Sequence, residues 1–353
     1  MKNNPNFFDK PIVVKKLREF YTYVKKNDGQ IGTKQRGIEL NFNNLCNFRC
    51  KHCFTNSHIG ERAKEMLPID KVADLADQAH ELGMFEFDLQ GGELTMRPDL
   101  LYEVVEAIRP ERFYLYVTTN GYKFDVEIAE KLAALGVSRL SVSIDSMDPA
   151  VHDEFRGKKG ALQKALDALE YANTAGMAAY MNITVGHYNA NTDHFKQLLD
   201  YSKDNNYKTL LNVAVPAGMW QKMSEIICDD KDREYLKKMR KEYKNLVRNM
   251  WNPFDRNHEK ILGCTTVNRL YITPIGDVLV CPYVHIKIGN IFESSLKEIV
   301  DYGFSIKYFR NHSDLCLAGE DKEFIKKFMT KSGQTIFKPA LAEEIFSKED
   351  FVK

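Results

Sequence analysis

Between residues 37 and 215 the chain alternates short apolar runs with longer amphipathic stretches, and this alternation constrains its fold more than any other feature. Six of the runs have the composition of strands: GIELNF (37–42), FEFDLQ (85–90), FYLYVT (113–118), RLSVSI (139–144), AYMNITV (179–185) and TLLNVAV (209–215). Repeated βα units predict an α/β fold whose parallel sheet curves into a partial (β/α)6 barrel. An open doubly wound sheet is the alternative, because periodicity does not separate the two.

The regions outside this barrel predict smaller units. Residues 1–36 are expected to form an N-terminal helical extension, since apolar side chains recur at helical spacing from Val13 to Val24. A second stripe, from Leu236 to Met250, predicts an amphipathic helix within a linker over 216–260. The segment LYITPIGDVLVCPY predicts a β-hairpin that turns at Ile275-Gly276-Asp277. The expected units are therefore the extension (1–36), the barrel (37–215), the linker (216–260), a small C-terminal domain (261–325) and a tail (326–353).

Composition excludes several classes of partner. Fifty basic and 49 acidic side chains give a net charge of +1, so no bulk charge favours nucleic acid. No apolar run approaches the roughly 18 residues that a membrane span needs, and the first ten residues contain no secretion signal. We therefore expect a cytoplasmic protein with no nucleic-acid or membrane partner.

Three of the seven cysteines lie within eight residues, directly after the first predicted strand. Cys46, Cys50 and Cys53 form the segment CNFRCKHC, and three thiolates on one loop leave the fourth corner of a metal centre open. A closed zinc site would need His52 or His58 as its fourth ligand. An iron–sulfur cluster accepts three cysteines and leaves one iron open to a substrate or cofactor. Spacing alone leaves both interpretations open.

Polar segments follow the next predicted strands at the point where each strand ends. Gly91-Gly92-Glu93 follows the second strand, Thr118-Thr119-Asn120-Gly121 ends the third, and Ser143-Ile144-Asp145-Ser146 ends the fourth. In a barrel of βα units these carboxyl ends meet at one face, which is where ligands bind. We expect a ligand site there, with Asn182, Thr184, His187 and Asn212 near its mouth as groups that orient hydroxyls.

With these segments, residues 37–215 resemble the radical S-adenosylmethionine (SAM) superfamily. The resemblance rests on CNFRCKHC, the GGE after strand two, TTNG, and RLSVSIDSMDPAVHDEFRG. It implies that Cys46, Cys50 and Cys53 bind a [4Fe–4S] cluster and that SAM chelates the fourth iron. It further implies that His52 seats the adenine, and that the remaining cofactor-binding residues are Gly91, Gly92 and Glu93 at the methionine amino end, Thr119, Asn120, and Ser143 with Arg156 near the carboxylate.

The second half resembles the SPASM domain, or its shortened twitch form, which holds auxiliary iron–sulfur clusters. Cys264, Cys281 and Cys316 are the implied ligands, and too few cysteines remain for more than one auxiliary [4Fe–4S] cluster. The fourth ligand is open: Cys228 would close the site, while His285, His312 and Glu320 are other candidates. Cys228 would otherwise be a buried free thiol or a hydrogen-atom donor. We expect ligation by three cysteines.

The resemblance implies an enzyme that reductively cleaves SAM to a 5′-deoxyadenosyl radical, with a reductase, flavodoxin or ferredoxin as electron donor. Only 36 residues precede the first strand, which favours a small polar substrate such as a sugar or cyclitol over a peptide with a leader. We expect an oxidoreductase that abstracts hydrogen from this substrate and uses the auxiliary cluster. The alternatives are a peptide-modifying maturase, by oxidation or crosslinking, and a noncatalytic carrier of iron–sulfur cluster or SAM.

Overall fold

A computed structural model describes residues 9–56, 65–329 and 334–352, and one eleven-stranded sheet organises them. Its strands are β1 (Gly37–Asn41), β2 (Glu86–Gln90), β3 (Tyr114–Thr119), β4 (Arg139–Ser143), β5 (Ala178–Val185), β6 (Lys208–Val213), β7 (Leu246–Val247), β8 (Arg269–Ile272), β9 (Asp277–Cys281), β10 (Val284–Asn290) and β11 (Ala340–Leu341). The first six coincide with the six predicted runs. Neighbouring strands from β1 to β7 are parallel.

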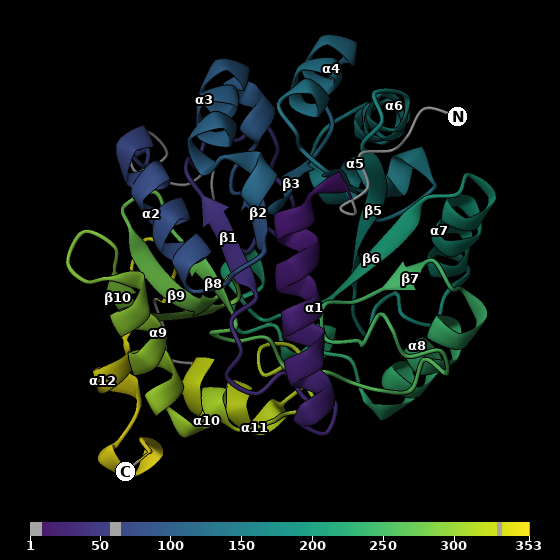
Figure 1. The fold of residues 1–353 in the computed structure, drawn as a ribbon. Helices are drawn as coiled ribbons and strands as arrows, with labels where there is room; N and C mark the ends of the chain where they lie inside the picture. Colours follow the sequence, from purple (N-terminus) through teal and green to yellow (C-terminus); the bar gives the residue numbers. More distant parts are fainter. Residues whose placement is uncertain (1–8, 57–64, 330–333, 353) are drawn as a thin grey trace.

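The order of the strands decides between the two predicted architectures. Across the sheet it is β11-β10-β9-β8-β1-β2-β3-β4-β5-β6-β7, so β1 to β7 follow one another without a reversal. A doubly wound sheet reverses its strand order at a switch point, whereas a barrel does not. Figure 1 shows the sheet as an arc with α2, α3, α4, α6 and α7 around its outside. The partial barrel is confirmed, and its two edges do not close.

Helices alternate with the strands along most of the described chain. They are α1 (Pro11–Lys26), α2 (Ile69–Glu81), α3 (Pro98–Ile108), α4 (Val126–Ala134), α5 (Pro149–Arg156), α6 (Ala161–Thr174), α7 (Asp193–Asp204), α8 (Asp230–Glu242), α9 (Leu296–Ser305), α10 (Lys307–Arg310), α11 (Lys322–Phe324) and α12 (Ala342–Ile345). Asp148 caps α5 by accepting hydrogen bonds from two backbone N–H groups. Gly83 follows α2 with a φ of +76°, the left-handed conformation that glycine adopts freely.

One predicted helix is wrong in its second half. Helix α8 ends at Glu242, although the apolar stripe continues to Met250. Leu246–Val247 instead form the short strand β7, which lies beside β6 in the sheet. The helical spacing of apolar residues therefore extends beyond the end of the helix. Residues 246–247 leave the helical pattern because the neighbouring strand β6 supplies their backbone hydrogen bonds.

Helix α1 covers the amino ends of the barrel strands. Just before it, the Lys10 ammonium donates to the carbonyls of Pro110, Phe113 and Gly136 at 2.7–3.0 Å, and these lie in the turns that lead into β3 and β4. Burial lowers the pKa of Lys10 to about 8. In Figure 1 the helix crosses the open front of the arc. The opposite end, where the strands finish, is thus left for ligands.

The predicted hairpin forms and extends the barrel sheet. Strands β8 and β9 are antiparallel and turn near Gly276, as expected. Strand β8 also runs parallel to β1, so that Arg269 at its start projects beside β1 and β2. The hairpin therefore brings the C-terminal cysteines to the barrel.

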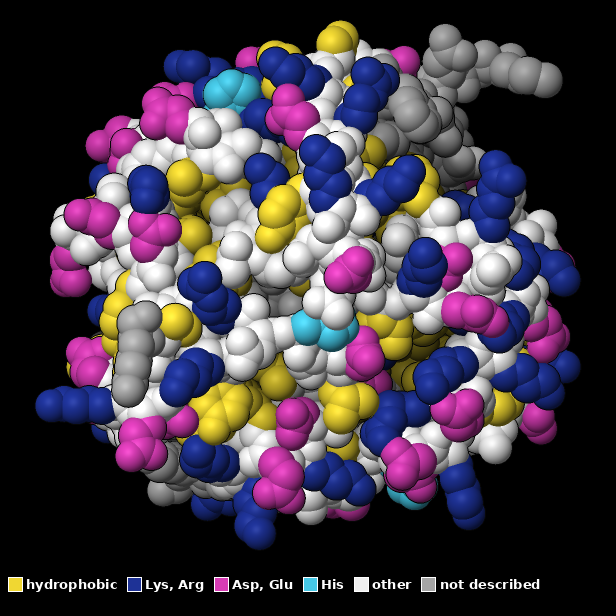
Figure 2. Space-filling model, turned by 60° about the horizontal axis from the view of Figure 1, so that its bottom comes forward, with side chains coloured by type: hydrophobic (Ala, Val, Ile, Leu, Met, Phe, Trp, Pro, Cys, Tyr) yellow, Lys and Arg dark blue, Asp and Glu magenta, His cyan; other side chains and the backbone are white. Residues whose placement is uncertain are grey.

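The surface gives no single-sign charge field on the face drawn in Figure 2, where basic and acidic side chains are interspersed. No helix within the described ranges is both long and apolar enough to span a membrane.

Candidate active site and metal centres

The carboxyl ends of the strands surround a cavity that gathers every site residue predicted in the first half of the chain. These lining residues are Cys46, Cys50, His52, Cys53, Gly91, Gly92, Glu93, Thr119, Asn120, Ser143 and Arg156. Asn182, Thr184 and Asn212 line the same cavity, as expected for groups near its mouth. These lining residues are spread from position 46 to position 212, and they meet here because the strands of parallel βα units all end at one face.

The two glycines after β2 allow the cysteine loop to lie against them. A Cβ on Gly92 would collide with the backbone carbonyl of Leu45, and one on Gly91 would collide with Asn41. The Gly92 N–H donates to the Asn43 carbonyl at 3.2 Å. The glycines therefore serve first to fit two backbones together, directly ahead of Cys46.

Glu93 is buried and holds the ends of β2 and β3 together. Its Oε1 accepts hydrogen bonds from the Thr95 N–H (3.0 Å) and from the hydroxyls of Thr95 and Thr119 (2.6 Å each). Among the described residues, its Oε2 accepts one hydrogen bond, from the Asn120 N–H at 2.7 Å. A carboxylate oxygen has two lone pairs, so Oε2 keeps capacity for one more donor, such as an ammonium group in the cavity.

Arg156 is held beside the cysteine loop by the aspartate of the SID segment. Its Nε and Nη2 both contact Asp145 Oδ2, at 2.7 and 2.6 Å, and both side chains are more than nine-tenths buried. The remaining Nη1 lies 3.9 Å from the Cys50 sulfur. Arg156 therefore turns inward, whereas the neighbouring Glu154 pairs with Lys51 at the surface.

An aromatic wall closes one side of the cavity. The His52 ring stacks on Phe155 at 4.6 Å between centroids, and Trp220 lies 5.6 Å away. Burial, and then the nearby Arg156, lowers the pKa of His52 to about 3, so its ring is neutral. Its Nδ1 is buried with no hydrogen-bond partner among the described residues. Sequence reasoning missed Phe155 and Trp220, since neither belongs to a polar motif.

The three loop cysteines fit a metal cluster. Burial raises the pKa of the Cys46 thiol to about 12 and also raises that of Cys50, with neighbouring thiolates adding to both shifts. Three thiolates in one buried cavity therefore require a cationic partner, which an iron–sulfur cluster supplies. His52 stacks on Phe155, so the described residues offer no fourth protein ligand for zinc, and His58 lies outside the described residues.

A second group of cysteines lies in a cavity that adjoins the first. Cys264, Cys281 and Cys316 line this cavity, and a hydrogen bond between the Cys264 and Cys316 thiols lowers the pKa of Cys264 while raising that of Cys316. Glu320 accepts the Cys316 N–H at 2.8 Å and is itself gripped by both terminal nitrogens of Arg248 at 3.1 and 2.7 Å. These buried thiols fit an auxiliary cluster with three cysteine ligands.

The candidates for a fourth ligand differ in their surroundings. Glu320 is occupied by Arg248, and His312 pairs with Asp314 at 2.8 Å. His285 is buried, and its Nε2 has no hydrogen-bond partner in the described part of the chain. Cys228 is fully buried and donates to the Val185 carbonyl at 3.7 Å, and it lines neither cavity.

The two cavities are continuous. Six residues line both of them: Gln90, Thr118, Asn182, Asn212, Val213 and Tyr283. Beneath them Arg269 pairs with Glu39 at 2.8 Å, and Asp88 lies nearby. Burial, and then the Glu39 carboxylate, raises the pKa of Asp88 to about 7. Sequence reasoning missed Glu39, Asp88 and Arg269, although strand alternation places the first two on the inward face.

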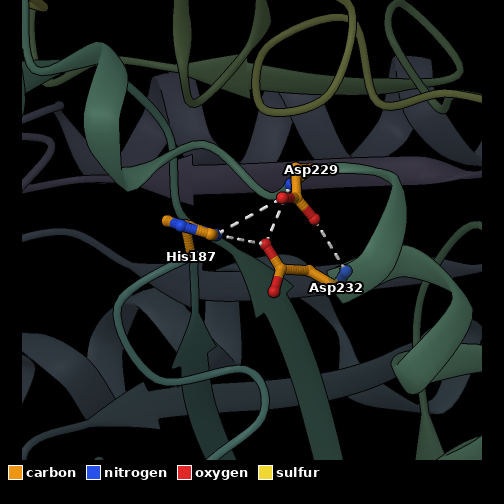
Figure 3. Close-up of side chains that lie close together, drawn as sticks. All are labelled: His187, Asp229 and Asp232. Atoms are coloured by element: carbon orange, nitrogen blue, oxygen red, sulfur yellow. Dashed lines mark hydrogen bonds and ion pairs between the residues drawn. The ribbon is translucent and has the colours of Figure 1, made fainter.

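His187 does not reach the cavity. Figure 3 shows it beside Asp229 and Asp232, with its Nδ1 2.8 Å from Asp232. Both aspartates form the capping box that begins α8, so the cluster is explained by the helix end. The expectation that His187 orients substrate hydroxyls is therefore not supported by its position.

The partial barrel carries three half-buried thiols at its carboxyl face, and a second group of thiols lies in the adjoining polar cavity. This arrangement defines an iron–sulfur enzyme with two cluster sites around one chamber. Comparison with known families agrees with this description. Residues 40–202 match the radical SAM superfamily, and residues 264–318 match SPASM, an iron–sulfur cluster-binding domain. The chain is a radical SAM enzyme with a C-terminal SPASM domain. Its cofactors are SAM and [4Fe–4S] clusters, and it requires an electron donor.

Individual relatives differ in what their names describe. The chain is 27% identical over 296 residues to an AdoMet-dependent heme synthase of Methanosarcina barkeri, covering 76% of this chain and 83% of that protein. It is 32% identical over 157 residues to the mycofactocin maturase MftC of Mycobacterium ulcerans, covering 44% and 42%. The fold is similar to SuiB of Streptococcus suis bound to the precursor peptide SuiA, with a TM-score of 0.59, 17% identity and coverage of 83% and 69%.

Proposed function

We propose that this enzyme is an oxidoreductase that removes hydrogen from a polar small molecule, such as a sugar or cyclitol, held between its two cysteine groups. The observation that carries the proposal is the continuous cavity from Cys46, Cys50 and Cys53 to Cys264, Cys281 and Cys316. Its shared wall presents amide and hydroxyl groups, which suit a substrate rich in hydroxyls.

The residues around the first cysteines bind and orient SAM. When reduced, the cluster and SAM supply a 5′-deoxyadenosyl radical that takes one hydrogen atom from a substrate carbon. Glu93 Oε2 accepts a hydrogen bond from the ammonium group of SAM, and Arg156 and Ser143 lie beside its carboxylate. The aromatic wall that contains His52 borders its adenine. Thr119 and Asn120 hold Glu93 in place. These groups also displace water from the chamber.

The second cavity offers acceptors for the proton and the electron that an oxidation releases after hydrogen abstraction. Converting an alcohol to a carbonyl releases one hydrogen atom, one proton and one electron. Asp88 lies on the cavity wall, accepts the Thr118 hydroxyl at 2.9 Å, and has a pKa raised by burial to about 7, which suits a proton acceptor. A cluster held by Cys264, Cys281 and Cys316 would supply the acceptor for the electron. A reductase, flavodoxin or ferredoxin would supply the electron for a cluster held by Cys46, Cys50 and Cys53.

None of the seven cysteines, all of which lie in the described ranges, forms a disulfide, and this suits an enzyme of the reducing cytoplasm. Peptide modification is the second candidate, and the match to a mycofactocin maturase over 157 residues favours it. A noncatalytic carrier of iron–sulfur cluster or SAM is the third candidate. Such a carrier would not need a polar chamber between the two cysteine groups.

The test is anaerobic turnover of reconstituted, reduced protein with SAM and a panel of deuterated sugars, cyclitols and peptides. We expect a sugar or cyclitol to stimulate 5′-deoxyadenosine and to transfer deuterium into it. Asp88→Asn should slow product formation but leave SAM binding unchanged, and Asp74→Asn, on the outer helix α2, should change neither. Stimulation by peptides alone would establish the second candidate. No SAM cleavage in fully loaded protein with any substrate would leave only the carrier.

A further inference from the structure

A third cavity lies at the opposite end of the barrel, beneath α1. It has a volume of about 240 Å³ and is bordered by the first residues of β2, β3, β4 and β5. Leu17 and Tyr21 of α1 form one side, and Trp251 forms another. The cavity shares no lining residue with the cavity at the loop cysteines, so the proposed SAM-binding residues do not account for it. It adjoins the cavity at Cys264, Cys281 and Cys316, with which it shares Leu210, Arg248 and Asn249.

Arg139 is the most unusual group in this cavity. It is only 7% exposed, and its guanidinium lies 3.6 Å from the centre of the Tyr116 ring and 4.5 Å from that of Tyr180. No described residue forms a hydrogen bond or ion pair with it, and its buried Nε has no acceptor. Aromatic faces offset part of the charge of a buried guanidinium, but they leave its N–H donors unpaired. The site is therefore short of an acceptor.

The approach to the cavity is also basic. Arg18, Lys25 and Lys26 line the adjoining groove on α1, which shares Leu17, Tyr21 and Phe254 with the cavity. Glu86 is the acidic group on the cavity wall, and it is bound by the Nε atoms of Arg36 at 2.8 Å and of Arg269 at 2.9 Å. Glu86 is thus paired twice, whereas Arg139 feels the Asp88 carboxylate only beyond ion-pair distance and has no paired carboxylate among the described residues. The balance of charged groups around the cavity favours binding of an anion.

Size and lining narrow the class of ligand. A dry cavity of about 150 Å³ accommodates benzene, so one of 240 Å³ has room for a single ring and a small substituent. Rings of Tyr114, Tyr116, Tyr180 and Trp251 provide flat apolar contacts. We propose that this cavity binds a small monocyclic aromatic acid, whose ring lies among the tyrosines and whose carboxylate pairs with Arg139. An arginine fork matches a carboxylate in two parallel hydrogen bonds.

The probe for the test is 4-fluorobenzoate, followed by fluorine NMR on the full protein, with 4-fluorobenzyl alcohol as its neutral counterpart. We expect the acid to bind and the alcohol to bind at least about tenfold more weakly, because only the acid pairs with Arg139. SAM should not displace the probe. Equal binding of both probes, displacement by SAM, or no binding of the acid at 10 mM (roughly 100-fold above a 0.1 mM dissociation constant) would each overturn the proposal.

Two variants locate the binding. Arg139→Met removes the charge at similar length and should weaken the acid at least about tenfold, whereas Arg97→Met, at an exposed arginine, should not. Leu17→Trp fills the cavity from α1 without altering the guanidinium and should also abolish binding. If Arg139→Met does not fold, the Leu17→Trp result decides. Unchanged binding of 4-fluorobenzoate in the folded variants would place the probe elsewhere and overturn the proposal.

Discussion

The two carboxylate oxygens of Glu93 differ in the hydrogen bonds that they accept, and we expect Oε2 to face the ligand. Oε1 accepts three hydrogen bonds from Thr95 and Thr119, whereas Oε2 accepts one from Asn120 and retains a free lone pair. We predict that Glu93→Ala lowers SAM affinity by roughly tenfold to over a hundredfold, the cost of about 1.5–3 kcal/mol for a charged hydrogen bond. It should also lower the unfolding midpoint, because buried donors lose their acceptor.

Equilibrium SAM binding and thermal unfolding of reconstituted protein would measure both effects, with iron content little changed. Glu103→Ala, at an exposed position of α3, is the matched control and should leave affinity and midpoint unaltered. Normal SAM affinity in Glu93→Ala would show that Oε2 does not face the ligand.

Cys228 illustrates how a side chain's surroundings decide its role. It is buried among apolar residues, and its thiol donates to the Val185 carbonyl, while burial raises its pKa to about 12. We predict that Cys228→Ser, in a protein already lacking Cys46, Cys50 and Cys53, keeps the iron and the cluster spectrum unchanged. Loss of that remaining cluster would make Cys228 its fourth ligand and refute ligation by three cysteines.

At the scale of elements, the loop after β2 is built to fit the loop after β1. Gly92→Ala would place a methyl group against the Leu45 carbonyl, so we predict displacement of the cysteine loop and less iron bound at the first site. Gly83→Ala is the matched control, since its Cβ would meet open space and only its φ of +76° is strained. It should cost about 1 kcal/mol of stability and leave iron content normal. Equal iron loss in both variants would contradict this role for Gly92.

The elements also show how far sequence reasoning reached. The runs of strand composition predicted the first six barrel strands, because apolar periodicity is a local property of the sequence. The end of α8 was missed, since β7 depends on the neighbouring β6. For the same reason Arg269 was missed: its partners Glu39 and Asp88 are far away in sequence, and only the pairing of β8 with β1 brings them together. Motifs located the SAM cavity, and tertiary packing built the second one.

At the scale of the whole molecule, the barrel holds three chambers along its axis. The loop cysteines mark the first, the SPASM cysteines the second, and Arg139 the third. The first two share a polar wall, so the proposed hydrogen abstraction and electron removal would take place around one substrate. The expected domain boundary at 216–260 stays a prediction, although β8 and β1 belong to one sheet.

The central claim is that the two cysteine groups hold separate clusters and that only the loop group cleaves SAM. The most direct measurement is 5′-deoxyadenosine production, together with iron content, in anaerobically reconstituted Cys46→Ala/Cys50→Ala/Cys53→Ala protein. Its matched control is the triple alanine variant of Cys264, Cys281 and Cys316. The first variant should lose one cluster's iron, keep the auxiliary cluster spectrum and form no 5′-deoxyadenosine, while the control should still cleave SAM but not oxidise substrate. SAM cleavage by the first variant would contradict the assignment.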